Sequence, residues 1–372
     1  MLYHLLVPLS ETGGFFKVFN VFRYVSFRTA WALITCLGFC YVLYPSFIRW
    51  MQKKKLEQII RTDGPESHRL NKAGTPTMGG VPMLIGITAS TLLWCRLDQP
   101  VVWMALVVLV GYGLIGFYDD WKKVMEKSTD GLSGKGKILG QVVIGGGVFG
   151  YGYLTGVVTP DIPLPFVKDT AINFAELWSG APDLSFLYLG AAVFILVGAS
   201  NAVNLTDGLD GLAIGPVMTS ASTYGILAYV AGHTVFSEYL SVSYVAGASE
   251  LTVMSLSIVG AGLGFLWYNA YPAQIFMGDV GSLALGGVLA ALALLTKQEI
   301  LLALVGGIFV LEAVSVILQV GSFKLTGKRV FAMAPIHHHY EKQGWSEPKI
   351  IVRFWIISIL LALVALSTLK LR

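Results

Sequence analysis

Long apolar runs separated by short polar segments extend along the whole chain. A helix needs roughly 20 residues to cross a hydrocarbon core of about 30 Å. Runs of that length lie approximately at 27–48, 76–95, 100–118, 137–157, 184–203, 211–232, 250–270, 280–296, 299–321 and 351–369. The pattern predicts an all-α polytopic membrane protein with about ten transmembrane helices, forming a single integral membrane domain over residues 1–372. The longest segment on the side without basic clusters, 158–183, is expected to form an irregular cap.

The composition supports this interpretation. Hydrophobic residues make up 55% of the chain and charged residues 13%, far below the roughly 25% charged residues of an average soluble domain. No segment between the apolar runs is long and apolar enough to bury a soluble core. The three cysteines lie inside apolar runs without paired metal-ligand spacing, so we expect them to be packing residues.

The distribution of the basic residues predicts how the chain is oriented across the membrane. Seventeen of the 26 lie in three loops, after the first, third and ninth apolar runs, whereas the alternate loops hold only Arg96, Lys168 and Lys297. Because positive charge is retained in the cytoplasm, the basic loops are predicted to be cytoplasmic. Both termini then lie on the outer, periplasmic side.

Five unusual polar clusters fall on the predicted cytoplasmic side. They are Lys72 to Gly80 (KAGTPTMGG), Asp119-Asp120, Asn201 to Gly211 (NAVNLTDGLDG), Asn269 to Ser282 (NAYPAQIFMGDVGS) and Pro335 to Tyr340 (PIHHHY). Random placement would put about half of them on each side, so their agreement indicates one site.

The acidic clusters suggest metal and phosphate chemistry. Asp119 and Asp120 repel each other unless a cation neutralises them, although alone the pair would be a helix end with local ion pairs to Lys122 and Lys123. Four more amide or carboxylate groups follow at the membrane edge, where they are costly unless a ligand satisfies them; they are Asn201, Asn204, Asp207 and Asp210. Carboxylates from separate loops suit Mg²⁺, which binds oxygen ligands and shares them with substrate phosphates.

The three consecutive histidines leave two alternatives open. His337, His338 and His339 could bind a transition metal or contact phosphate; side chains adjacent on a loop diverge and no cysteine is nearby, which favours phosphate. Gln319 lies near the cytoplasmic end of its helix and could reach the site. Glu312 is deeper and is expected to be paired structurally.

Together these motifs resemble the polyprenyl-phosphate N-acetylhexosamine-1-phosphate transferase superfamily, and within it the phospho-N-acetylmuramoyl-pentapeptide transferases. The resemblance covers nearly the whole chain and includes GTPTMGG, FMGDVGS and APIHHHYE, in order and with helices between them. It implies transfer of phospho-MurNAc-pentapeptide from UDP-MurNAc-pentapeptide to undecaprenyl phosphate, yielding lipid I and UMP with Mg²⁺ as cofactor. It also implies a homodimer in the bacterial cytoplasmic (inner) membrane, with the active site facing the cytoplasm and no nucleic-acid partner.

The resemblance also implies residue roles. Asp279 would bind the metal, and the catalytic group would be Asp119, Asp120, Asp279, His337 and His338. The substrate-binding group would be Lys72, Thr75, Lys123, Asn201, Asn204, Asp207, Asp210, Asn269, Phe276, Gln319 and His339. Phe276 is expected to stack on uracil. The stretch 131–137 receives no role beyond its basic charge.

Two alternatives remain. A superfamily relative that transfers GlcNAc-1-phosphate would share the aspartates, and the histidine stretch argues for the MurNAc-pentapeptide substrate instead. A cation-coupled transporter would place acidic residues near the bilayer midplane, whereas these lie at one surface. Whether Asp119 or Asp120 acts as nucleophile or base is left open.

Overall fold

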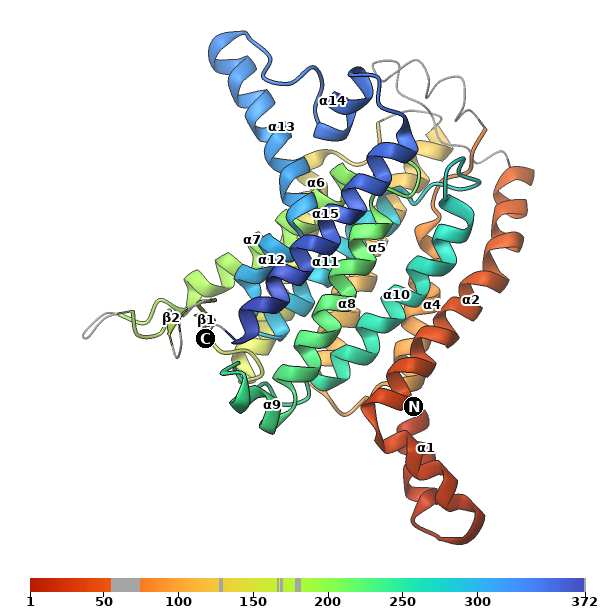
Figure 1. Cartoon of the computed structure of the whole chain (residues 1–372), viewed down its shortest axis with the longest axis vertical. Coiled ribbons are helices and arrows are strands. Elements are labelled where there is room, and N and C mark those ends of the chain that lie inside the picture. Colours follow the sequence, from red (N-terminus) through yellow and green to blue (C-terminus); the bar gives the residue numbers. More distant parts are fainter. Residues whose placement is uncertain (55–73, 127–129, 166, 168–169, 178–181, 371–372) are drawn as a thin grey trace.

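A computed structural model describes residues 1–54, 74–126, 130–165, 167, 170–177 and 182–370 (Figure 1). Lys72, one of the predicted substrate-binding residues, lies outside these ranges. Nine of the ten predicted apolar runs each coincide with one helix in the described part of the chain, and the run 299–321 covers two. The main helices are α2 (Val25–Lys53), α4 (Gly80–Trp94), α5 (Pro100–Glu126), α6 (Gly134–Leu154), α7 (Ser185–Thr206), α8 (Ile214–Ala231), α10 (Ser249–Asn269), α11 (Gly278–Leu295), α13 (Gly307–Thr326) and α15 (Glu347–Ser367).

Shorter elements complete the described chain: α1 (Leu2–Ser10), η1 (Gly14–Arg23), α9 (Thr234–Tyr239), α12 (Glu299–Val305), α14 (Ile336–Lys342) and η2 (Thr368–Lys370). Two expectations need correction. The run 299–321 is two helices, because the Gly306-Gly307 pair, with its low helix propensity, separates α12 from α13. The cap 158–183 contains an antiparallel pair of strands, β1 (Asp161–Pro163) and β2 (Ala171–Asn173).

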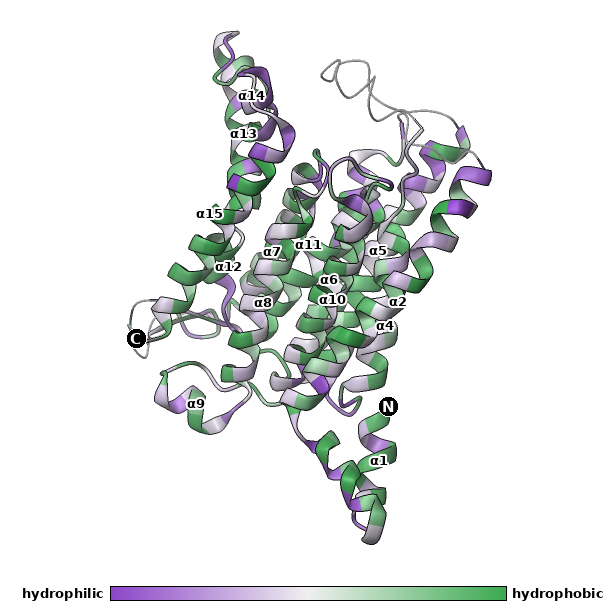
Figure 2. Ribbon diagram, turned by 45° about the vertical axis from the view of Figure 1, so that its right-hand side comes forward, coloured by the Kyte–Doolittle hydropathy of each residue, from purple (hydrophilic) through white to green (hydrophobic). Residues whose placement is uncertain are grey.

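The described helices confirm an all-α polytopic membrane protein. Seven of them are long and apolar enough to cross a membrane, namely α2, α5, α7, α10, α11, α13 and α15, and α4 is a shorter apolar helix. Figure 2 shows hydrophobic colouring along the middle of the bundle, with hydrophilic residues gathered at its ends, notably around α14. The number of crossings, about ten, stays a prediction.

Helix α11 forms the centre of the bundle. All its residues from Val280 to Leu295 are buried, and it packs against α5 and α7 along most of its length. Glycine permits the closest approaches. A Cβ on Gly80 would collide with the backbone of Gly281, so α4 and α11 touch at their N-terminal ends. This contact lies beside the aspartate of α11, and it therefore helps to position the site.

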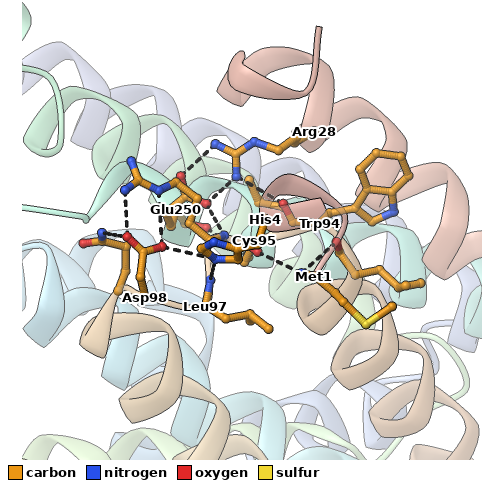
Figure 3. A network of polar contacts seen from close by, with 12 residues as sticks. Met1, His4, Arg28, Trp94, Cys95, Leu97, Asp98 and Glu250 are labelled. Atoms are coloured by element: carbon orange, nitrogen blue, oxygen red, sulfur yellow. Dashed lines mark hydrogen bonds and ion pairs between the residues drawn. The ribbon is translucent and has the colours of Figure 1, made fainter. Parts of the chain in front are cut away.

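A polar network closes the opposite end of the bundle (Figure 3). Arg28 of α2 makes a bidentate ion pair with Glu250 of α10, at 2.5 and 2.8 Å, and both side chains are almost fully buried. Glu250 also accepts a hydrogen bond from the backbone N–H of Arg96. Because an unpaired charge is costly in this environment, the network fixes α2, α4 and α10 together far from the predicted site.

Candidate active site

The site begins where α5 ends and α11 starts. A Cβ on Gly116 would collide with the backbone of Asp279, so the two helices meet in backbone contact one turn before Asp119 and Asp120. One ligand oxygen from each of the three aspartates lies within 4.8 Å of the others. The predicted convergence of separate loops on one acidic cluster is therefore present in the structure.

The backbone fixes two of these carboxylates. Asp119 is fully buried, and its Oδ1 accepts a hydrogen bond from the Leu132 N–H at 2.6 Å. Asp120 Oδ2 accepts one from the Val280 N–H at 3.1 Å, in the first turn of α11. The positive end of the α11 dipole thus faces a carboxylate, which stabilises the negative cluster.

Two lysines neutralise part of the acidic charge. Lys123 Nζ lies 2.5 Å from Asp119 Oδ2 and 3.3 Å from Asp279 Oδ2. Lys137 Nζ, from α6, lies 2.6 Å from Asp279 Oδ2 and 3.0 Å from Asp119 Oδ2. When all three carboxylates are ionised, the two ammonium groups leave the cluster with a formal charge of minus one, which favours a cation.

Sequence reasoning missed Lys137, since the stretch 131–137 was given no role beyond basic charge. A usable signal was present. Gln141 stands one turn later inside an apolar run, and a polar side chain at that spacing indicates that this face of the helix turns towards the protein. Lys137 belongs to the same face.

The two asparagines of α7 differ in their partners. Asn204 donates from Nδ2 to Asp279 Oδ1 at 2.9 Å and to Ser282 Oγ at 2.8 Å, so it lies in the site. Asn201 lies one turn deeper and donates to Gln141 Oε1 at 2.9 Å and to the Val197 carbonyl. The structure therefore joins Asn204 to the acidic cluster and directs Asn201 into the helix packing.

His337 occupies a buried position beside the loop 207–211. Its Nδ1 lies 3.1 Å from Glu312 Oε2, and both side chains are inaccessible to solvent, so Glu312 has the structural pairing expected for it. Its Nε2 has no hydrogen-bond partner among the described residues. That nitrogen faces Gly208, where any Cβ would collide with it. The glycine therefore lets the imidazole approach the loop.

The other two histidines have other polar partners, although the His338 ring packs against that of His337, with ring centroids 4.1 Å apart. His338 Nδ1 lies 2.6 Å from Glu341 Oε2, one turn along α14. His339 accepts a hydrogen bond from the Ala332 N–H and contacts Gln343. Each of the three rings thus has a different carboxylate or amide partner.

The segment before α4 supports the loop that carries Phe276. The Phe276 N–H donates to the Pro76 carbonyl at 2.9 Å, and the Gly79 N–H donates back to the Phe276 carbonyl at 2.8 Å. Phe276 is half-buried, as is Thr75 beside this ladder. The GTPTMGG stretch therefore positions the loop that leads into Asp279.

The loops 207–211 and 269–275 are joined by side chains of the predicted nucleoside-binding group. Asn269 accepts from the Gly211 N–H and donates to the Ile275 carbonyl, each at 2.8 Å, so both ends of its amide have backbone partners. Asp210 accepts from the Ala273 N–H at 3.0 Å. Asp207 is half-buried at the end of α7. These bonds hold the two loops side by side.

Gln319 lies on α13, away from the acidic cluster. Its Oε1 accepts hydrogen bonds from the N–H groups of Val330 and Phe331, and its Nε2 donates to the Phe331 carbonyl. The side chain therefore fastens the segment before α14 to α13, which fixes the approach of the histidines.

The donor set of the cluster fits a hard divalent cation. Asp119, Asp120 and Asp279 offer only carboxylate oxygens, with no cysteine and no histidine among the three. Asp279, with 16% of its side chain exposed, is the most accessible of them. These three carboxylates fit Mg²⁺ better than zinc, which prefers nitrogen and sulfur ligands.

Comparisons with known proteins agree with this geometry. Residues 102–297 match Glycosyl transferase family 4, and residues 72–81 match Phospho-N-acetylmuramoyl-pentapeptide-transferase signature 1. Proteins named phospho-N-acetylmuramoyl-pentapeptide-transferase are similar over 100% of both chains: 58% identical in Pelobacter propionicus, 56% in Syntrophus aciditrophicus and 55% in Citrifermentans bemidjiense. The chain belongs to the phospho-N-acetylmuramoyl-pentapeptide-transferase family.

Proposed function

We propose that this chain transfers phospho-MurNAc-pentapeptide from UDP-MurNAc-pentapeptide to undecaprenyl phosphate, producing lipid I and UMP for peptidoglycan synthesis. The observation that carries the proposal is the cluster of three aspartates and two lysines at one end of a membrane bundle, in a chain of this family. One substrate is anchored in the bilayer and the other is soluble, so the reaction requires a site at the membrane surface.

The main chemical problem is charge. A phosphate monoester has a second pKa of about 6, so the attacking oxygen of the lipid phosphate is already mostly ionised at neutral pH. This anion must approach an anionic diphosphate in line with the bond that breaks. Lys123 and Lys137 are 30% and 19% exposed, and their ammonium groups can turn from the aspartates to the phosphates when both substrates bind.

Magnesium belongs to the proposal. Asp279, with Asp119 and Asp120 beside it, would hold Mg²⁺, which when bound supplies positive charge to the diphosphate oxygens. Asn204 orients the Asp279 carboxylate through its 2.9 Å hydrogen bond. Asp119 is fully buried, accepts a hydrogen bond from the Leu132 N–H and pairs with both lysines, so it would also orient their ammonium groups.

The remaining residues would bind or position the nucleotide part of the UDP-linked substrate. Phe276 presents a half-buried aromatic face on the loop before Asp279, where a uracil ring can stack, and Asp207 and Lys72 would supply polar contacts. Asn269 contributes by holding the two loops together. Glu312 orients His337 so that its buried Nε2 lies against the loop 207–211, and the imidazole would therefore hold this loop in place for the substrate.

The proposal also includes the location, orientation and oligomeric state of the protein. The enzyme lies in the bacterial cytoplasmic membrane as a homodimer, with its active site facing the cytoplasm and both termini outside. The basic residues concentrated at the site end support this orientation.

Substrate choice tests the proposal against the GlcNAc-1-phosphate alternative. UMP release is measured from UDP-MurNAc-pentapeptide and from UDP-GlcNAc at equal undecaprenyl phosphate. We expect the first substrate to be used at least about 100-fold better, about 2.7 kcal/mol in transition-state binding. A preference for UDP-GlcNAc would assign the chain to the alternative activity.

A further inference from the structure

Helix α6 has an unusual buried face. Its fully buried positions are Gln141, Gly145, Phe149 and Gly152, which recur at helical spacing, while Leu139 and Val143 are more than 60% exposed on the other side. The two glycines on the buried face let neighbouring helices approach closely, but without side chains they make few contacts that would fix the rotation of α6. The orientation of α6 about its own axis is therefore set by the two larger buried side chains, Phe149 and, nearest the site, Gln141.

Gln141 uses both ends of its amide between helices. Its Nε2 donates to Ser200 Oγ at 2.9 Å, and its Oε1 accepts from Asn201 Nδ2 at 2.9 Å. Ser200 extends this hydrogen-bonded chain to α11, because its hydroxyl donates to the Leu283 carbonyl at 2.8 Å. One side chain thus links α6 to α7 directly and to α11 through a single hydroxyl.

A further bond ties the same residue to α5. The Tyr112 hydroxyl donates to the Gln141 carbonyl at 2.9 Å, and both residues are fully buried. The three helices that meet at Gln141 include the two that carry the aspartates. Water cannot replace these bonds inside the bundle, so a rotation of α6 that breaks them leaves polar groups unsatisfied.

Lys137 lies one helical turn before Gln141 on the same face of α6. Its ammonium group contacts Asp279 and Asp119, which come from α11 and α5. The Gln141 bonds connect α6 to those same helices one turn deeper. The distance from Lys137 to the aspartates is therefore set by a rigid connection directly beneath it.

We propose that Gln141 is a positioning residue that holds Lys137 against the aspartate cluster. Gln141 touches neither the aspartates nor the substrates, and it acts through the orientation of α6. The activity it supports is the one proposed above, so its role in turnover rests on that proposal, whereas its effect on the position of residue 137 does not.

The kinetic test replaces the Gln141 amide with a side chain of similar size that forms no hydrogen bonds, whereas the Tyr112 bond to the backbone carbonyl of residue 141 is retained. Gln141→Leu should lower kcat about 10- to 100-fold while changing KM for either substrate less than threefold, because binding groups stay in place. In a double-mutant cycle, the effect of Gln141→Leu should largely disappear in a Lys137→Met background. Full additivity in that cycle would overturn the proposal, since a purely structural loss would be the same in both backgrounds.

A matched control removes a buried hydrogen bond elsewhere. Thr252 donates to the Gly225 carbonyl at 3.0 Å, in the outer part of α10, so Thr252→Val should leave kcat within threefold of the unaltered enzyme. An equal kcat loss in this variant would show that any packing defect has the effect. If Gln141→Leu fails to fold, Ser200→Ala removes the partner of Nε2 with a smaller change, and an unchanged kcat there would contradict the proposal.

Cross-linking tests the position of residue 137 without using activity. The pair Lys137→Cys and Asp279→Cys is joined with a short bifunctional thiol reagent, with Gln141 intact and with Gln141→Leu. We expect cross-linking at least threefold slower in the second case, and equal rates would overturn the proposal. An unaltered enzyme that releases no UMP would refute the proposed function alone and leave this result standing.

Discussion

Lys137→Met is the substitution for which the structure gives the clearest expected effect. Methionine fills a similar volume without charge, so the packing of α6 is retained while the ammonium group is lost. Lys137 Nζ lies 2.6 Å from Asp279 Oδ2 and 3.0 Å from Asp119 Oδ2, and its side chain is only 19% exposed. The variant therefore leaves three carboxylates with Lys123 as their one cationic neighbour among the described residues.

The size of the effect follows from these distances. Two unit charges 4 Å apart interact by about 4 kcal/mol at an effective dielectric constant of about 20. Lys123 neutralises part of the same negative charge, and the partial exposure of Lys137 weakens its interaction with the aspartates. Only part of that energy is therefore lost from the transition state. We expect kcat to fall about 100- to 1,000-fold, or about 2.7 to 4 kcal/mol, as for the loss of other groups that stabilise developing charge.

The assay measures UMP release from UDP-MurNAc-pentapeptide with undecaprenyl phosphate in detergent, alongside thermal unfolding. Lys135→Met is the matched control, because Lys135 carries the same charge two residues earlier, is exposed and makes no ion pair in the described structure. It should keep kcat within threefold. An equal loss in both variants, or a Lys137→Met enzyme within threefold of the unaltered one, would refute the role of Lys137.

Other predictions concern the nucleotide, the outer network and the topology. Phe276→Ala should raise KM for the nucleotide substrate at least about 10-fold, some 1.4 kcal/mol, and leave KM for the lipid nearly unchanged; equal losses would mean that Phe276 only packs. Glu250→Gln should lower the stability in detergent by about 3 to 5 kcal/mol because it leaves Arg28 buried without its partner, whereas Asp98→Asn, in an exposed pair, should cost less than about 1 kcal/mol. A membrane-impermeant thiol reagent should label Asp130→Cys and Thr170→Cys from opposite sides, and labelling from one side would contradict the topology.

Much of the fold could be predicted because a bilayer imposes a simple length rule. Ten apolar runs gave ten helical regions, and the error at Gly306 arose because a glycine pair interrupts a helix without changing its hydrophobicity. The strand pair β1–β2 was missed because its three-residue strands are too short to show alternation.

The site was predictable to the extent that polar groups are unusual at a membrane edge. Asp119, Asp120, Asp279 and Asn204 meet as expected. What the pattern could not give is the direction of each side chain: Asn201 and Gln319 have the expected residue types but face helix packing and a neighbouring loop. Lys137 was overlooked because lysines are common in cytoplasmic loops, although the polar Gln141 one turn later already indicated which way α6 faces.

The most direct test of the account is UMP release by purified protein when UDP-MurNAc-pentapeptide, undecaprenyl phosphate and Mg²⁺ are each omitted in turn, for the unaltered enzyme and for Asp279→Asn. We predict release only with all three present, and at least about a 1,000-fold loss, about 4 kcal/mol, in the variant, which should remain folded in the membrane. Release without the lipid phosphate or without Mg²⁺, or an Asp279→Asn enzyme within threefold of the unaltered one, would contradict the account.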